Sequence, residues 1–485
     1  MIRNIEKLSK EHTLDPENWD SLIALGHNML DDMMNFLKDI RKHKIVPISE
    51  EVIAKIRQPV PLKSQGYEEA YKEFLEHVFP YPVPGMHPHF WGFVMGTGSP
   101  LGVLSEMLAA CMNSNGPNYF APYHIENQVI EWLKEILDYP QDASGVLVSG
   151  GSMANFTGLA VARNAKAQVD IKKQGVQDIQ NKMVLYTSKE GHKCLTRAIE
   201  LLGLGNESLR LIPVNEKFQI DIKRLETAIK EDKRAGFHPF CVIGNAGSVN
   251  TGAFDDLILL ADICEEEDMW FHIDGAFGAW AKLSSTHNYL TRGMERADSL
   301  AFDLHKWMYM PYEIGCTLVR DKEAHCKTFI YEAEYLENIF ERYEAPNYSV
   351  QLSRNFKALK AWILLKADGI EKYAQIIQQN IDQAYYLAEL IENKQELELV
   401  VPVSLNIVCF RYISENLGEE KLNDLNAQLL MHLWLNGMIP SYTTLNGKYT
   451  LRVCITNHRS TKEDFNNFVE EVVRIGNSVL SNQIA

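Results

Sequence analysis

The sequence predicts an α/β protein whose main domain contains a mostly parallel β-sheet with helices on both faces. Between about residues 120 and 320, short apolar segments alternate with helical ones, which is the pattern of repeated βαβ units. The predicted buried strands are residues 145–149, 183–187, 240–244, 270–273, 299–302 and 316–319. Polar residues follow several of these strands directly, and such sheets bind ligands at the carboxyl ends of their strands.

The elements follow in order along the chain. A first helix is expected with Asp15 as its N-cap and Pro16 at its first position, and its apolar stripe needs a partner surface, either a second chain or the large domain. Prolines in residues 79–88 exclude regular structure there. Helices are predicted at 154–167, 195–202, 255–268 and 353–366, and later strands at 399–402, 406–410 and 449–454. We therefore expect an N-terminal helical, dimerisation segment (1–93), a large domain (94–366) and a small C-terminal α/β domain (367–485).

Composition narrows the class of protein. The chain has 485 residues, a net charge of −16 and 46% apolar residues. Without a cluster of Lys and Arg to neutralise phosphates, we expect no nucleic-acid partner. No apolar run is long enough to span a membrane, and residues 1–10 have no signal-peptide core, so no membrane contact is expected. The eight cysteines are scattered without a C-x-x-C pair, which favours free thiols and a cytoplasmic enzyme.

A glycine-rich segment, Ser149-Gly-Gly-Ser-Met-Ala-Asn155, follows one predicted strand and opens a helix. Gly151 and Ser152 lie where a backbone can approach a phosphate and where a helix N-terminus offers free N–H groups. A simple tight turn would have the same pattern. The segment is neither a P-loop nor a G-x-G-x-x-G motif, which disfavours a nucleoside triphosphatase or a dinucleotide enzyme.

Two further polar residues follow strands. His192 could stack on an aromatic ring and transfer a proton, or lie in an ordinary polar loop. Asp274 ends an otherwise apolar run, so its carboxylate needs a positive partner: a pyridinium N–H, a nearby arginine, or a protonated His272. Gly275 and Ala276 are small, as a flat ring lying against that strand requires.

Lys306 follows the strand at 299–302 and is flanked by His305 and Trp307. Partial desolvation is expected to lower the pKa of its amine and to make the amine available for imine formation. An aspartate and a lysine at adjacent strand ends are what a pyridoxal phosphate (PLP) enzyme needs. The lysine forms a Schiff base, and the aspartate keeps the ring nitrogen protonated.

The motifs resemble those of the group II PLP-dependent decarboxylases, which include aromatic-L-amino-acid decarboxylase and have PLP fold type I. The matching segments are 149–159, 191–192, 271–276, 303–307 and 352–362, with weaker matches from about His87 to Arg452. The resemblance implies roles in PLP binding for Gly151, Ser152, His192, Ser248, Asp274, Ala276, His305 and Lys306. It also implies substrate contacts from His89, Phe90 and Arg452, although a buried ion pair is an alternative for Arg452.

The sequence departs from the family at two places. The family's loop tyrosine, which is implicated in protonating the product, falls at Ala345, so Tyr343 and Tyr348 are the candidates for that role. Asp303 stands where aromatic-type members often carry Asn, and an acid there needs a proton or a basic neighbour.

The sequence thus predicts a lyase of amino-acid metabolism, a homodimer by family analogy, that binds PLP and no metal ion. It would decarboxylate an L-amino acid, for which an aromatic side chain is one candidate, to CO2 and an amine. The alternatives are decarboxylation coupled to oxidative deamination, a carbon–carbon lyase, and a protein that keeps the fold and cofactor without turnover. Intact Asp274 and Lys306 argue against the last of these.

Overall fold

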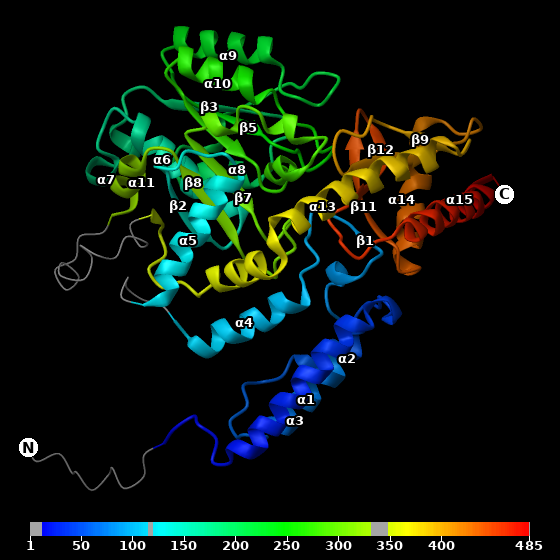
Figure 1. The fold of residues 1–485 in the computed structure, drawn as a ribbon. Coiled ribbons are helices and arrows are strands. Elements are labelled where there is room, and N and C mark those ends of the chain that lie inside the picture. The colour runs from blue at the N-terminus through cyan, green and yellow to red at the C-terminus, as the bar shows by residue number, and fades with distance from the viewer. Residues whose placement is uncertain (1–11, 115–119, 331–347, 485) are drawn as a thin grey trace, which may run out of the picture. The chain divides into compact units, whose positions relative to one another are not determined.

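The structure, a computed structural model, describes residues 12–114, 120–330 and 348–484 (Figure 1). The chain divides into two units, Met1–Pro84 and Gly85–Ala485.

The N-terminal unit contains three helices, α1 (Trp19–Lys38), α2 (Glu50–Ile56) and α3 (Tyr67–His77). The N-cap of α1 is Asn18, whose side chain accepts a hydrogen bond from the Ser21 N–H at 3.1 Å. The prediction of Asp15 as the cap is therefore wrong: the helix begins one turn later, where an amide oxygen can reach the free N–H groups. The Tyr71 hydroxyl joins α3 to α1 by donating to Asp32 at 2.8 Å.

The larger unit is built on a seven-stranded sheet with the order β2-β8-β7-β6-β5-β3-β4. The strands are β2 (Ser144–Val148), β3 (Met183–Ser188), β4 (Leu209–Ile212), β5 (His238–Asn245), β6 (Trp270–Asp274), β7 (Ser299–Asp303) and β8 (Gly315–Val319). All run parallel except β8, which is antiparallel to both β2 and β7. The predicted α/β fold is confirmed, and the loops that follow β2, β3, β5, β6 and β7 leave the same edge of the sheet.

Helices cover both faces of this sheet, as the alternation of side chains along its strands requires. In β3, Met183 and Leu185 belong to the core beneath α6 and α8, whereas Val184 and Tyr186 belong to the core on the opposite face, with α5, α9 and α10. The helices are α4 (Pro100–Met112), α5 (Ala121–Ile136), α6 (Gly151–Lys166), α7 (Ile171–Gln174), α8 (Cys194–Leu201), α9 (Ile222–Arg234), α10 (Leu257–Glu266) and α11 (Lys322–Phe329).

Each of the six strands predicted for this sheet is present, with slightly different ends. Strand β4 was not predicted. It lies at the edge of the sheet, where Arg210 is half-buried and Leu211 is exposed, so it has no continuous apolar run to mark it.

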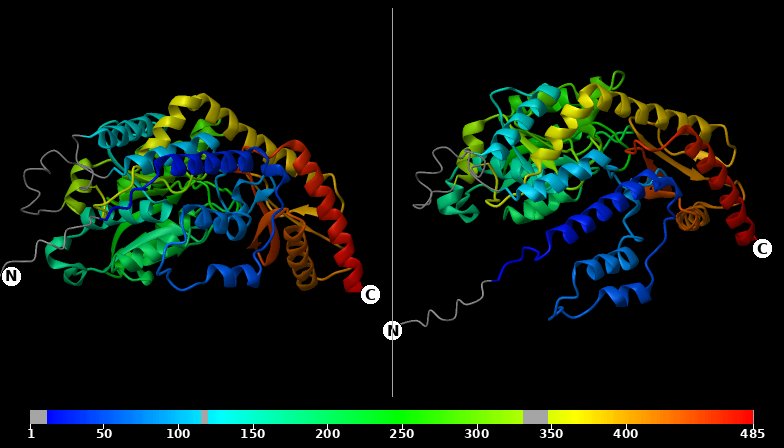
Figure 2. Two further views of the ribbon diagram at one scale, coloured as in Figure 1. Left: turned by 90° about the horizontal axis from the view of Figure 1, so that it is seen from below. Right: turned by 60° about the horizontal axis from the view of Figure 1, so that its bottom comes forward.

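A long helix, α13 (Ala358–Glu392), leads from the large sheet to a second, smaller sheet and is kinked at Gly369 (Figure 2). It packs against α4 and α5 near its start and against β9, β10 and α15 further on. The small sheet has the order β1-β11-β12-β10-β9. Its elements are β1 (Phe90–Trp91), β9 (Leu397–Leu399), β10 (Ile407–Tyr412), β11 (Ile439–Leu445) and β12 (Lys448–Cys454), with helices α14 (Glu419–Leu435) and α15 (Lys462–Ile484).

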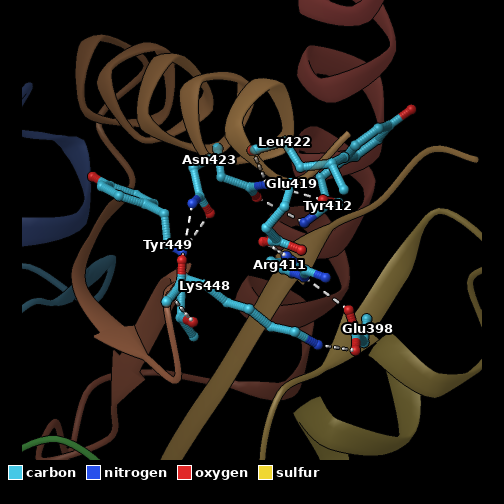
Figure 3. A network of polar contacts seen from close by, with 11 residues as sticks. Glu398, Arg411, Tyr412, Glu419, Leu422, Asn423, Lys448 and Tyr449 are labelled. Atoms are coloured by element: carbon cyan, nitrogen blue, oxygen red, sulfur yellow. Dashed lines mark hydrogen bonds and ion pairs between the residues drawn. The ribbon is translucent and has the colours of Figure 1, made fainter. Parts of the chain in front are cut away.

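A polar network fastens the small sheet to α14 (Figure 3). Arg411 of β10 is only 5% exposed; its guanidinium donates to Glu398 of β9 at 2.8 Å and also pairs with Glu419 of α14. Lys448 of β12 reaches the other oxygen of Glu398 at 3.0 Å. Three strands and one helix thus share one set of charges.

Among the described residues, no helix is both long and apolar enough to cross a membrane.

Candidate active site

A cavity of about 630 Å³ opens at the carboxyl edge of the large sheet. Loops after β2, β3, β5, β6 and β7 line one side, and α14, β11 and β12 line the other. The cavity brings together these residues predicted from the sequence: Gly151, Ser152, His192, Ser248, Asp274, Ala276, His305, Lys306 and Arg452.

The glycine-rich segment forms a narrow cradle at the N-terminus of α6. A Cβ on Gly151 would lie 2.8 Å from an oxygen of Asp303, and a Cβ on Gly150 would lie 3.0 Å from the imidazole of His305. Both contacts are too close for a side chain, so only glycine fits. Ser152 is exposed and faces the cavity, where the first N–H groups of the helix are free to bind an anion.

Asp274 is buried at the end of β6, with only 6% of its surface exposed. Within the described ranges no lysine, arginine or histidine forms an ion pair with it, and its one hydrogen bond is with the Ala276 N–H at 3.2 Å. Burial lowers the pKa of His272 to about 3, so this histidine is neutral and is not the positive partner. A buried carboxylate that faces a cavity without a cation in ion-pair contact is suited to a cationic ligand.

Lys306 forms an ion pair with Asp303, with 2.8 Å between the ammonium nitrogen and one carboxylate oxygen. Burial lowers the pKa of Lys306, but the negative charges of Asp303 and Asp274 outweigh burial, and the net direction is upward. The expectation that desolvation lowers the pKa of this amine is therefore wrong, because two carboxylates face it. Asp303, for its part, has the basic neighbour that an acid at this position requires.

His192 faces the cavity from the loop after β3. Its Nδ1 accepts a hydrogen bond from the Cys194 N–H at 3.2 Å, so the neutral ring carries its proton on Nε2. Burial lowers the pKa of His192 below its ordinary value, although Asp274 and Asp303 oppose the shift. The imidazole is consequently neutral at pH 7 and has one N–H to offer to a ligand.

His305, Ser248 and Ala276 complete the wall. His305 Nδ1 lies 2.9 Å from the Ile314 carbonyl oxygen, and burial lowers the pKa of this imidazole. The Ser248 hydroxyl lies 3.0 Å from the hydroxyl of Thr251. The methyl group of Ala276 would lie 3.5 Å from a Cβ on Gly151, so β6 and the cradle approach each other closely here.

Arg452 is 3% exposed, and its guanidinium donates to main-chain carbonyl oxygens rather than to carboxylates. Its Nη1 donates to the Phe93 carbonyl at 2.8 Å, and its Nε donates to the Asn250 carbonyl at 3.2 Å. Among the described residues it forms no ion pair, and its Nη2 has no hydrogen-bond partner. The alternative of a buried ion pair is thus not observed.

Three other predicted residues lie elsewhere. His89 Nε2 is 3.0 Å from Asp464, and Phe90 is buried in β1, where it pairs with Ile439 of β11. Neither lines the cavity, because the chain enters the small sheet at this point; Phe93 and Val94 line it instead. Tyr348 packs on His325 in a buried cluster with β2 and likewise does not line the cavity. Tyr343 lies outside the described residues.

Sequence reasoning missed several residues that line the cavity. Asn155 is one helical turn after Gly151, a spacing that could have indicated its place. Cys194 follows His192 closely, and burial raises the pKa of its thiol to about 12. Four others lie only a few residues from the predicted Phe90, His192, Ser248 and Lys306; they are Phe93, Glu190, Asn250 and Tyr312. Trp434, Ser441 and Tyr442 come from a distant segment whose approach no local pattern signals.

The donor set fits PLP. An anion cradle, the small side chain of Ala276, a buried carboxylate and a lysine surround one cavity, and these are the groups that a phosphate, a ring, a ring nitrogen and an aldehyde require. The carboxylate of Asp274 lacks a cationic partner among the described residues, and a pyridinium N–H would supply one.

Comparisons with known proteins agree with this geometry. Residues 51–413 match the family model described as the pyridoxal-dependent decarboxylase conserved domain. An aromatic-L-amino-acid decarboxylase from Bacillus atrophaeus is 35% identical over 462 residues, which cover 92% of this chain and 93% of that protein. A phenylacetaldehyde synthase from Petunia hybrida is 27% identical, covering 91% of each protein.

The fold has close counterparts among solved structures. The crystal structure of Oryza sativa TDC with PLP and tryptamine has a TM-score of 0.89 at 23% identity and covers 96% of this chain and 99% of that chain. Its fold is PLP fold type I. The chain therefore belongs to the pyridoxal-dependent decarboxylase family and is a PLP-dependent carboxy-lyase.

Proposed function

We propose that this chain decarboxylates an aromatic L-amino acid and releases CO2 and the corresponding amine. The observation that carries the proposal is the cavity itself. Its inner end holds Lys306, Asp274 and His192, and its outer part is lined by the aromatic side chains of Phe93, Trp434 and Tyr442. Aromatic rings arranged around an apolar substrate ring favour its binding.

In this proposal two sets of residues hold the two ends of the cofactor. Gly151 and Ser152 bind the phosphate through the N-terminus of α6, with His305 beside them and Ser248 on the other side. Asp274 binds the ring nitrogen, and Ala276 leaves room for the ring. When bound, PLP supplies an electron sink for the electron pair that the departing carboxylate leaves at Cα.

The chain's own residues then handle protons and orientation. Lys306 holds the cofactor until the substrate amine displaces it, after which its amine is free within the cavity. His192 would contact the cofactor ring and, being neutral, would offer its Nε2–H as a hydrogen bond to a substrate oxygen.

The outer part of the cavity offers a second anchor. Arg452 presents a buried Nη2 that has no partner among the described residues, and a carboxylate is the group that such a donor binds best. We infer that Arg452 fixes the orientation of the substrate by an acidic or polar group, while the aromatic side chains contact its ring.

A second candidate is decarboxylation coupled to oxidative deamination, which gives an aldehyde. It is favoured by relatives named as phenylacetaldehyde synthases and by the departure at Ala345 in the loop after the lysine. Measured stoichiometry of CO2, amine, aldehyde and peroxide separates the two. Amine without aldehyde would eliminate the oxidative reaction.

The direct test is a screen for amine release across the amino acids with the PLP-loaded chain, and with Lys306→Ala as the control. The expected result is turnover of one or a few aromatic amino acids that the control lacks. Turnover confined to acidic or aliphatic amino acids would contradict the proposed substrate class.

We also propose that the chain is a homodimer. Three apolar side chains of α4, Met107, Leu108 and Met112, are each 44% exposed or more, and such a surface favours a partner. Light scattering of the purified protein measures the state; a monomer at micromolar concentration would contradict it.

A further inference from the structure

A chain of four hydrogen bonds joins β7 and β6 to the N-terminus of α6, behind the wall of the cavity. The Trp270 indole N–H donates to the Ser299 hydroxyl at 2.8 Å, and that hydroxyl lies 2.7 Å from His272 Nδ1. His272 Nε2 lies 2.8 Å from the side-chain oxygen of Asn155, whose NH2 donates to the Gly151 carbonyl at 2.9 Å. His272, Ser299 and Asn155 have no exposed surface.

The proton positions in this series of hydrogen bonds follow from its last acceptor, the Gly151 carbonyl. The Gly151 carbonyl can only accept, so the NH2 group of Asn155 faces it and the Asn155 oxygen faces His272. His272 must then carry its proton on Nε2. Since burial keeps this imidazole neutral, with a pKa lowered to about 3, its Nδ1 accepts from the Ser299 hydroxyl. Each of the four bonds therefore runs in one direction, from the Trp270 indole to the Gly151 carbonyl.

This series of hydrogen bonds links the two parts of the proposed cofactor site. His272 precedes Asp274 by two residues on β6, so the two side chains leave the same face of that strand. Gly151 is the first residue of α6 and part of the phosphate cradle. Helix α6 lies directly on the imidazole: a Cβ on Gly158 would approach the ring to 2.7 Å. The spacing between β6 and α6 is thus fixed by this contact.

We propose that His272 and Asn155 are positioning residues that hold the Gly151 cradle at the distance from Asp274 that a phosphorylated cofactor needs. The inference rests on the proposed placement of PLP. Neither residue contacts the reacting atoms; both act through the Gly151 carbonyl, which the Asn155 amide fixes. If these residues served core stability alone, their substitution would lower the affinity for every ligand equally. If they position the cradle, substitution lowers the affinity for a phosphorylated ligand selectively.

The test compares PLP with pyridoxal, which lacks the phosphate, by fluorescence titration of the full-length chain. Asn155→Leu removes both hydrogen bonds at similar volume, and His272→Phe removes those of the imidazole. Each is expected to raise the Kd for PLP about tenfold, the factor that corresponds to one lost hydrogen bond to a buried group, with a much smaller change for pyridoxal. His272→Gln, which can keep an N–H toward Asn155, is expected to recover most of the PLP affinity.

Thr157→Val is the matched control, because Thr157 lies on the same helix, is fully buried, and has a hydroxyl without a hydrogen-bond partner in the described part of the chain. It should leave both constants unchanged. Equal losses for PLP and pyridoxal, or no loss in folded variants, would overturn the inference. If Asn155→Leu or His272→Phe fails to fold, the smaller Asn155→Ala, which also removes the amide, decides the question, since an unchanged ratio of the two constants in that variant would refute positioning. Failure of the unaltered chain to bind PLP would instead refute the proposed function.

Discussion

The amine of Lys306 lies 2.8 Å from a carboxylate oxygen of Asp303, three residues earlier at the end of β7. Asp303 is 1% exposed, and its second oxygen has no hydrogen-bond partner among the described residues. The pair keeps the lysine charged before the cofactor binds, and it puts a negative charge directly beneath the Gly151 cradle. Asp303 therefore opposes both steps of cofactor capture, deprotonation of the amine and arrival of a phosphate.

Replacing Asp303 with Asn should speed the capture of PLP severalfold at neutral pH. Without the carboxylate, the pKa of Lys306 falls, so the neutral amine is present at lower pH and the rate–pH curve moves toward acid. Stopped-flow absorbance of PLP binding as a function of pH measures the shift. Asp303→Glu, which keeps the charge, is the control, and an unmoved curve in Asp303→Asn would contradict the assigned role.

His192→Phe should keep the affinity for PLP and lose turnover. A phenyl ring would preserve the proposed contact with the cofactor ring but has no Nε2–H, and loss of one such hydrogen-bond donor lowers kcat by roughly 10²–10³-fold. Burial lowers the pKa of His192, so it stays neutral until the pH falls through that lowered value. In the unaltered enzyme, the acid limb of kcat against pH should accordingly lie below the ordinary histidine range. An acid limb at ordinary histidine pH would show that His192 is not the group observed.

Substitution can distinguish the roles of Tyr343 and Tyr348. Tyr348 packs on His325 in a buried cluster, so Tyr348→Phe should leave the product unchanged. Tyr343→Phe should lower amine formation by at least about tenfold if Tyr343 supplies a proton to the product. Amine and aldehyde are quantified for both variants. Loss of amine in Tyr348→Phe alone would reverse the assignment.

Arg411→Ala should destabilise the small sheet by about 1–3 kcal/mol, because Glu398 and Glu419 lose their shared partner (Figure 3). Burial raises the pKa of Glu398, but its bonds to Arg411 and Lys448 outweigh this and the pKa is lowered. The pair's contribution is therefore present above the unfolded pKa of a glutamate and is lost as pH falls through the lowered value. Urea unfolding between pH 3 and pH 7 measures it. Lys327→Ala, at an exposed pair, should change stability by less than about 0.5 kcal/mol.

The sequence was sufficient to predict the site residues that follow the strands of the large sheet. Gly151, His192, Asp274 and Lys306 follow apolar runs, and parallel strands bring their carboxyl ends to one edge, so the periodicity placed them together. Local pattern could not place Phe93, Trp434 or Tyr442, since these depend on how the small sheet packs over that edge. The pKa of Lys306 was wrongly predicted because desolvation can be read from an apolar run, whereas the ion pair with Asp303 and the approach of Asp274 from the neighbouring strand depend on the folded geometry.

The central claim is that Lys306 holds PLP in this cavity, and one measurement tests it directly. The PLP-loaded chain is reduced with borohydride, digested, and searched by mass spectrometry for the phosphopyridoxyl group. The account predicts that the group is found on Lys306 and that Lys306→Ala carries none. A label on another lysine, or none on the unaltered chain, would contradict it.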